Sequence, residues 1–135
     1  MRPKFCPHTT LLIALAAAVL LAAGCQKSAE TPPPTVHPAG GKLLNRAGQP
    51  VAGGIIEFVK QGSEPRSLRA EVGLDGSFSL SVMTPEGVKY EGAEEGAYRV
   101  IYSPATDDQT VPPVELPASV KIQAGPNTLN LRLPK

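Results

Sequence analysis

An all-β domain is predicted for the chain after residue 35, from three observations. Apolar and polar residues alternate along short runs, which is the period of two expected of a strand. Clusters of Gly, Pro, Asn and Asp separate these runs. No window of eleven residues in this part carries a helical apolar stripe free of Pro and Gly. Together these features predict a single seven-stranded Greek-key sandwich.

Three runs account for the first half of the domain. Val36–Leu44 is the first expected strand, broken or bulged at residues 38–41, and it ends at a turn over residues 45–50. Gly54–Lys60 and Ser67–Val72 are the second and third strands, each with apolar side chains at alternate positions. Such strands bury one face and leave the other face to solvent.

The strongest local signal is the Asp-Gly dipeptide at residues 75–76, which lies between two alternating runs. Asp-Gly supports the positive backbone dihedral angles of a two-residue hairpin turn. It predicts a tight hairpin between the third strand and a fourth strand over Ser77–Val82. This fourth strand has the clearest alternation in the chain, with Phe78, Leu80 and Val82 expected inside and three serines outside.

Three more strands and two long loops complete the prediction. Ala97–Tyr102 is the fifth strand, preceded by a polar loop over Met83–Gly96 and followed by a proline-rich loop over Ser103–Pro117. Ala118–Gln123 and Thr128–Leu133 are expected to pair as a C-terminal hairpin. Seven strands are the number that a small two-sheet sandwich uses. The side chains expected to point inward from the last hairpin are Val120, Ile122, Leu129, Leu131 and Leu133.

The N-terminal residues have the layout of an export signal. Arg2 and Lys4 make the start basic, and Leu11–Ala23 is an unbroken apolar run of thirteen residues. A permanent membrane-spanning helix needs roughly 20 such residues, so this run is short for an anchor. A basic start, a short apolar helix and small residues at its end predict a signal peptide over residues 1–24, which is cleaved before residue 25.

Ala23, Gly24 and Cys25 resemble the lipobox of bacterial lipoproteins, in which small residues precede the cysteine that receives lipid. The chain departs from that pattern at Ala22, where the family has Leu, because Leu21 lies one place earlier. The resemblance implies cleavage between Gly24 and Cys25, a diacylglycerol thioether on Cys25 and an acyl chain such as palmitate on its amine. Two acyl chains suffice for stable anchoring, at about 0.8 kcal/mol per buried CH₂. The alternative is a secreted protein, cut near Ala23, with a free or disulfide-linked Cys25.

A polar, proline-rich tether is expected over residues 25–35, between the lipidated cysteine and the domain at residues 36–135. Three consecutive prolines at residues 32–34 favour an extended backbone. Ten residues of this kind span about 30 Å. In lipoproteins an Asp after the cysteine is associated with the inner membrane. Gln26 stands at that position here, which favours the outer membrane of the cell envelope.

Composition argues against several classes of partner. Loss of Arg2 and Lys4 with the signal leaves 11 basic and 12 acidic residues, a balance that gives no electrostatic attraction to nucleic acid. Six aromatic residues, none of them Trp, are few for a nucleic-acid or carbohydrate platform. Cys25 is the single cysteine left after cleavage, so burial alone must hold the core.

Four segments resemble the carboxypeptidase regulatory-like domains of the prealbumin-like (transthyretin-like) class. They are Gly41–Leu43, Gly48–Phe58, Asp75–Leu80 and Gly96–Val100, in a stretch that covers about residues 36–135. The family signature includes a Thr-Asp-x-x-Gly-x-Phe turn, and this chain departs from it with Val-Gly-Leu at residues 72–74. The resemblance implies a β-sandwich. It implies no reaction, because the matched positions are scaffold positions.

Candidate chemistry in the sequence is sparse. His37 is the single histidine of the mature chain and has no nearby cysteine or second histidine, so neither a catalytic triad nor a metal site is expected there. Acidic residues on the two long loops could bind calcium only if their oxygens converged, and solvated loop charge is the default interpretation. These residues are Glu91, Glu94, Glu95, Asp107 and Asp108. No cofactor is expected.

We therefore expect a non-enzymatic, lipid-anchored protein of the cell envelope that presents a small β-sandwich to a protein partner or supports envelope structure. Exposed sheet edges and the proline-rich loops are the surfaces that a partner would contact. The alternative is a module that binds glycan or peptide. A concave patch holding Tyr90, Tyr98 or Tyr102 with convergent polar groups would favour that alternative.

Overall fold

The computed structural model describes residues 32–62, 66–106 and 111–134, and every regular element in them is a β-strand. The all-β prediction is confirmed for this part of the chain, which holds no helix of the length and apolarity needed to cross a bilayer. Residues 1–31, with the predicted signal peptide, Cys25 and most of the tether, lie outside the described residues. The strands are β1 (Ala39–Leu44), β2 (Ile55–Lys60), β3 (Ser67–Glu71), β4 (Ser77–Ser79), β5 (Ser81–Met83), β6 (Lys89–Glu91), β7 (Gly96–Ser103), β8 (Val114–Glu115), β9 (Val120–Ile122) and β10 (Asn127–Arg132).

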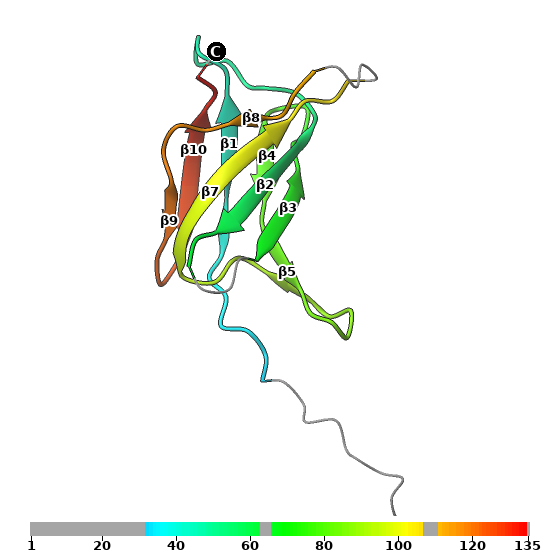
Figure 1. Cartoon of the computed structure of the whole chain (residues 1–135), viewed down its shortest axis with the longest axis vertical. Helices are drawn as coiled ribbons and strands as arrows, with labels where there is room; N and C mark the ends of the chain where they lie inside the picture. The colour runs from blue at the N-terminus through cyan, green and yellow to red at the C-terminus, as the bar shows by residue number, and fades with distance from the viewer. Residues whose placement is uncertain (1–31, 63–65, 107–110, 135) are drawn as a thin grey trace, which may run out of the picture. The chain divides into compact units, whose positions relative to one another are not determined.

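The strands form two principal sheets and one small hairpin (Figure 1). The three-stranded sheet has the order β10-β1-β4, and the five-stranded sheet has the order β3-β2-β7-β8 with β9 also paired to β7. β5 and β6 form a separate two-stranded sheet. In Figure 1 the five-stranded sheet lies in front of the three-stranded one, and one hydrophobic core draws buried side chains from both.

Alternation along the strands supplies that core. In β2, Ile56 and Phe58 are fully buried, whereas Ile55 is 46% exposed. The ring of Phe58 lies 5.8 Å from that of Phe78 on β4 and 6.2 Å from that of Tyr98 on β7, measured between centroids. The Phe58–Phe78 contact joins the two principal sheets, whereas Phe58 and Tyr98 belong to the same sheet. Each large aromatic ring buries more apolar area than an aliphatic side chain.

The contact between β1 and β10 depends on a glycine. β1 pairs with β10 in parallel and with β4 antiparallel, and Gly41 lies between Leu129 on one side and Phe78 on the other. A Cβ atom added to Gly41 would overlap the carbonyl oxygen of Leu129. A glycine normally weakens a strand, and here its lack of a side chain lets β10 approach β1 closely.

The predicted fourth strand is in fact two strands. The prediction of one strand over Ser77–Val82 is wrong, because β4 pairs with β1 while β5 pairs with β6. The predicted alternation is right, since Phe78, Leu80 and Val82 are all buried. The Leu80 N–H donates to the carbonyl of Ala39 (2.9 Å) and its carbonyl accepts from the Gly92 N–H (2.7 Å), so the backbone changes partner at this residue.

Two predicted hairpins also differ from the structure. The turn at residues 75–76 forms as expected, with Gly76 at φ 77°, but it connects strands of different sheets. The runs Ala118–Gln123 and Thr128–Leu133 do not pair with each other, because β9 pairs with β7 and β10 pairs in parallel with β1. A turn sequence determines where the chain reverses direction. It does not determine which strand each flanking strand pairs with.

Both predicted long loops contain short strands. β6 lies within the expected loop Met83–Gly96, and β8 lies within the expected loop Ser103–Pro117. The count of seven strands is therefore too low, since the described residues form ten. Runs of two or three residues are too short for alternation to be recognised in a sequence.

The remaining strands match their predictions closely. β2, β3 and β7 agree with the expected bounds to within one residue at each end. The expected interruption at residues 38–41 is confined to Pro38, since His37 forms an isolated bridge with Ala93 and β1 runs unbroken from Ala39. The turn over residues 45–50 is closed by the Asn45 N–H, which donates to the Gln49 carbonyl at 2.8 Å.

We predict that Gly41→Ala lowers the free energy of unfolding by more than about 3 kcal/mol, because β10 must move away from β1. Gly87→Ala is the control, since Gly87 has φ 82° but open space around it, and strain alone costs about 1–2 kcal/mol there. Urea unfolding followed by circular dichroism measures both. Equal losses in the two variants would show that the approach of β10 to β1 does not require glycine.

Candidate functional site

The side of β3, β2 and β7 that faces away from the core forms an open surface, here called the outer face. Its first row joins Ile55 on β2 to Glu71 on β3 and to Ser103 on β7. Its second row joins Glu57 to Arg69 and Ile101 in the same way. The strand register shows which residues share a row. Because the residues between them on each strand are buried, the side chains of these rows point away from the core.

Apolar side chains on the outer face are interspersed with ion pairs. Ile55, Val59 and Ile101 are exposed or half-buried there. Arg69 Nη2 lies 3.6 Å from Glu57 Oε2, and Arg99 Nε lies 3.7 Å from Glu115 Oε1. Exposed pairs of this kind stabilise a fold by at most about 1 kcal/mol each. Their effect on the surface is to cancel charge beside side chains that remain accessible.

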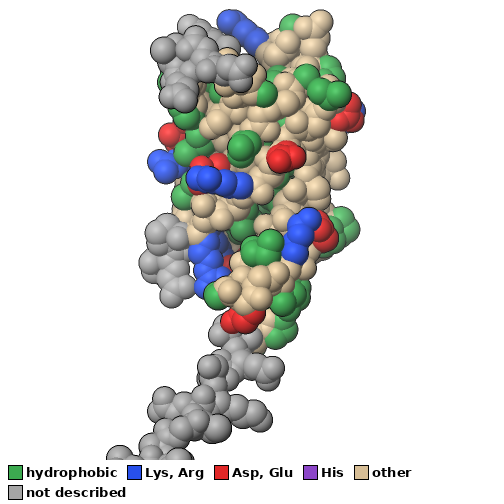
Figure 2. Space-filling model, turned by 90° about the vertical axis from the view of Figure 1, so that its right-hand side faces the viewer, with side chains coloured by type: hydrophobic (Ala, Val, Ile, Leu, Met, Phe, Trp, Pro, Cys, Tyr) green, Lys and Arg blue, Asp and Glu red, His purple; other side chains and the backbone are tan. Residues whose placement is uncertain are grey.

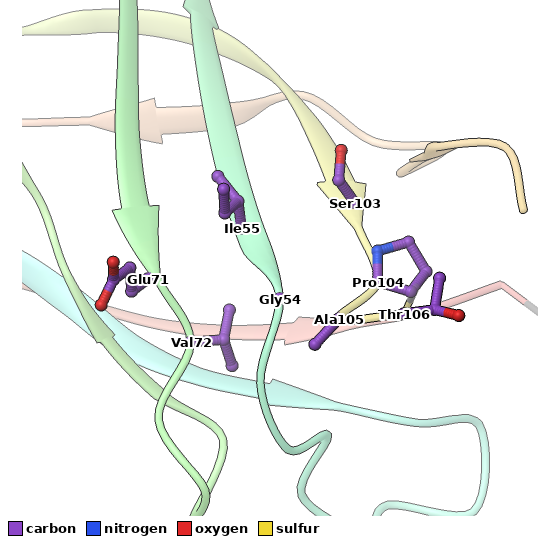
Figure 3. Close-up of a pocket in the computed structure, with 8 residues that line it drawn as sticks. All are labelled: Gly54, Ile55, Glu71, Val72, Ser103, Pro104, Ala105 and Thr106. Atoms are coloured by element: carbon purple, nitrogen blue, oxygen red, sulfur yellow. The ribbon is translucent and has the colours of Figure 1, made fainter. Parts of the chain in front are cut away.

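A shallow pocket of about 380 Å³ lies at the end of the outer face where β2 begins and β7 ends (Figure 3). Its walls combine apolar side chains with one carboxylate and two hydroxyl groups. The lining residues are Gly54, Ile55, Glu71, Val72, Ser103, Pro104, Ala105 and Thr106. The volume is near the lower limit of small-molecule sites, so the pocket suits one side chain of a partner.

Backbone geometry at Gly54 shapes this pocket. Gly54 has φ 92°, and a Cβ atom there would lie 2.5 Å from the Ser103 carbonyl oxygen and 2.7 Å from the Tyr102 ring. The Tyr102 hydroxyl donates to the Gly53 carbonyl at 2.9 Å. Burial raises the pKa of Tyr102, so the hydroxyl remains a donor. Because Gly54 has no side chain, the start of β2 can lie against the Ser103 carbonyl and the Tyr102 ring of β7.

Glu71 is the charged group of the pocket. It is exposed, and no ion pair joins it to any other residue that the structure describes. The Ser103 hydroxyl and the apolar side chain of Ile55 lie in the same cross-strand row. This combination can accept an apolar side chain that ends in a basic or hydrogen-bonding group.

A second cluster, centred on Glu94, has a structural role. Lys60 Nζ lies 2.6 Å from Glu94 Oε2, and Arg66 Nη1 lies 3.3 Å from Glu94 Oε1. The Tyr98 hydroxyl donates to the Glu94 carbonyl at 2.9 Å. Burial, and then the nearby Glu94 charge, raise the pKa of Tyr98 to about 12. The cluster ties the segment before β7 to the end of β2.

His37 is held by backbone groups from two distant connections. Its N–H donates to the Ala93 carbonyl at 2.8 Å, and its Nδ1 accepts from the Gly125 N–H at 3.2 Å. Its Nε2 lies 3.7 Å from Glu95 Oε1. The sequence predicted neither a triad nor a metal site at His37 and gave it no other role, whereas in the structure it helps to fix the start of β1.

Of the acidic residues that were considered as calcium ligands, those that the structure describes do not converge. They form separate ion pairs. Glu91 pairs with Lys89 at 2.8 Å, while Glu94 pairs with Lys60. Asp107 and Asp108 lie outside the described residues. Within residues 32–62, 66–106 and 111–134, no group of three or more His, Cys, Asp or Glu side chains is placed to hold a metal ion.

Two of the three tyrosines considered for a ligand patch belong to the core. Tyr98 is 1% exposed and Tyr102 is 4% exposed, and both hydroxyls bond to backbone carbonyls. Tyr90 lies on β6 opposite Val82. The pocket was not found from the sequence, where the only signal for it was the pair Gly53-Gly54 before an alternating run.

No family model, curated protein or solved structure matches the chain. The structure supports an all-β domain of about 100 residues with several sheets. The resemblance to carboxypeptidase regulatory-like domains stays a prediction. So does the lipidation site, because Gly24 and Cys25 lie outside the described residues.

We predict that Tyr98 makes stability fall at alkaline pH. Its folded pKa of about 12 is above the unfolded value of about 10, so the folded state binds the proton more tightly and loses stability as the pH rises from about 10 to about 12. Tyr98→Phe should cost about 1 kcal/mol at pH 7, through loss of the hydrogen bond to Glu94. The variant should also lack the decrease of about 2–3 kcal/mol in the free energy of unfolding that Tyr98 causes between about pH 10 and pH 12. Urea unfolding at several pH values tests this, and an unchanged alkaline slope in the variant would contradict it.

Proposed function

We propose that the chain is an exported lipoprotein whose β domain, of the prealbumin-like sandwich type, makes non-enzymatic contact with another protein of the cell envelope. Residues 1–24 are the signal peptide, Cys25 carries the lipid, and residues 25–35 are the tether. The basic start, the short apolar run and the small residues before Cys25 support the anchor. Gln26 supports placement in the outer membrane over the inner membrane.

The observation that carries the contact role is the composition of the outer face. Accessible Ile55, Val59 and Ile101 alternate with the Arg69–Glu57 and Arg99–Glu115 ion pairs. Accessible apolar side chains interspersed with paired charges are compatible with a non-obligate protein contact, which as a whole is only about as apolar as the rest of a protein surface. The pocket beside Glu71 adds a place for one projecting side chain of the partner.

The alternative function is binding of peptide or glycan, and the pocket favours peptide. Glycan sites usually rely on exposed aromatic rings, and Tyr98 and Tyr102 are buried. An extended peptide needs a pocket for a side chain and accessible backbone groups, which the region around Glu71 offers. A non-enzymatic role is supported by His37, whose Nδ1 already accepts a backbone hydrogen bond.

The anchor predicts a specific labelling result. Cells that express the chain are grown with a palmitate analogue, and the protein should carry the label unless Cys25→Ala is present. Cys6→Ala is the matched control, because Cys6 lies within the expected signal peptide and its loss should leave labelling unchanged. Recovery of unlabelled wild-type protein in the soluble fraction would contradict the anchor.

The contact role predicts where a partner can be captured. A photo-crosslinking amino acid at Ile55 on the outer face should give a discrete adduct in intact cells. The same amino acid at Met83 on β5 is the control, since Met83 is 63% exposed and lies outside the outer face. Adducts of equal yield from both positions, or from neither, would contradict a partner at this face.

A further inference from the structure

The edge of β3 that points away from β2 has free backbone groups. The Val72 N–H donates to the Gly54 carbonyl at 2.9 Å and the Lys60 N–H donates to the Arg66 carbonyl at 2.8 Å, at the two ends of the β2–β3 ladder. Antiparallel bonding alternates, so the even-numbered residues of β3 bond to β2. The N–H and C=O groups of the odd-numbered residues therefore point outward, where no described strand pairs with them.

The outward-facing side chains of this edge strand are accessible. Ser67, Arg69 and Glu71 are exposed, while Leu68 and Ala70 between them are buried. β3 lies at the right-hand side of the domain in Figure 1, and Figure 2 faces that side. Acidic and basic side chains lie close together there, with no broad area of one charge. An exposed edge of this kind is a template for a further strand.

The charge pattern of the edge is complementary to itself. Arg69 and Glu71 are two positions apart on one face of β3. When two such strands pair antiparallel about a twofold axis at Ala70, each Arg69 lies opposite Glu71 of the other copy. Opposite charges in directly opposed positions stabilise a strand pair, and like charges destabilise it. A twofold axis at Arg69 would instead oppose two arginines, so charge selects the first register.

The backbone hydrogen-bonding groups and the core-facing side chains of β3 are also compatible with this register. Arg69 and Glu71 have outward backbone groups, so the two opposed positions form hydrogen-bonded pairs of the antiparallel kind. On the core side, Leu68 lies opposite Val72 of the second copy and Ala70 opposite Ala70. The Arg69 side chain is 70% exposed beside Glu57, so it can bridge Glu57 and Glu71 of the second copy.

We propose that two copies of this chain associate by antiparallel pairing of their β3 edges, which joins the two five-stranded sheets into one. The twofold axis is normal to the sheet, so both outer faces lie on the same side and a partner would meet them together. The association uses the domain alone and does not rest on the lipid at Cys25. A single short strand pair is smaller than a standard interface, so the association is weak.

Charge reversal on the full chain tests the proposal, by sedimentation velocity in a non-ionic detergent over a range of protein concentrations. Arg69→Glu gives the edge two acidic side chains, and Glu71→Arg gives it two basic ones. Each variant alone should self-associate at least tenfold more weakly than wild type. A 1:1 mixture of the two should recover the association, because acidic edges then oppose basic edges. Arg132→Glu, on the free edge of β10, is the matched control and should leave the association unchanged.

Several results would overturn the proposal. Wild-type protein that stays monomeric up to millimolar concentration excludes the pairing. Variants that associate as well as wild type, or a mixture that does not recover, exclude this edge or this register. An equal loss with Arg132→Glu shows that the effect of charge is not specific to the β3 edge and excludes the proposed contact. Thermal unfolding of each variant checks that a lost association does not come from a lost fold.

Discussion

The contact of the Phe58 ring with Phe78 joins the two principal sheets of this domain, and the contact of Phe58 with Tyr98 packs the core side of the five-stranded sheet. The domain contains no cysteine after residue 25, so no covalent link within it can replace this packing. Once these rings lie between the sheets, alternate residues on β2 and β7 must point outward. The outer face, with Ile55 and Ile101, is therefore a direct consequence of the same alternation that builds the core.

The second constraint is the close approach of strands at glycine residues, which shapes the candidate site. Gly41 lets β10 lie beside β1, and Gly54 lets β2 begin against Ser103 and Tyr102. The first contact places the last strand beside the first. The second contact brings the starts and ends of β2, β3 and β7 together and leaves the shallow pocket beside Glu71. An edge strand and an open sheet face remain, and both are suited to contact with another chain.

Local sequence patterns predicted the directions of side chains well and the partners of strands poorly. Phe78, Leu80 and Val82 are buried as expected, although their run divides between two sheets at Leu80. The Asp-Gly turn reverses the chain as expected, although its two strands enter different sheets. The pocket could not be foreseen, because Glu71, Ile55 and Ser103 come from three strands whose register no local pattern contains.

The sequence by itself determined that the domain is all-β, where most of its turns lie and which side chains face the core. These are properties of a few consecutive residues, because a strand presents alternate side chains to opposite faces wherever it is placed. Only the tertiary structure decided that β10 joins β1 in parallel, that His37 meets Gly125 across 88 residues and that β3 is left with a free edge. Those outcomes depend on satisfying backbone hydrogen bonds and burying apolar area over the whole chain at once, which no short segment specifies.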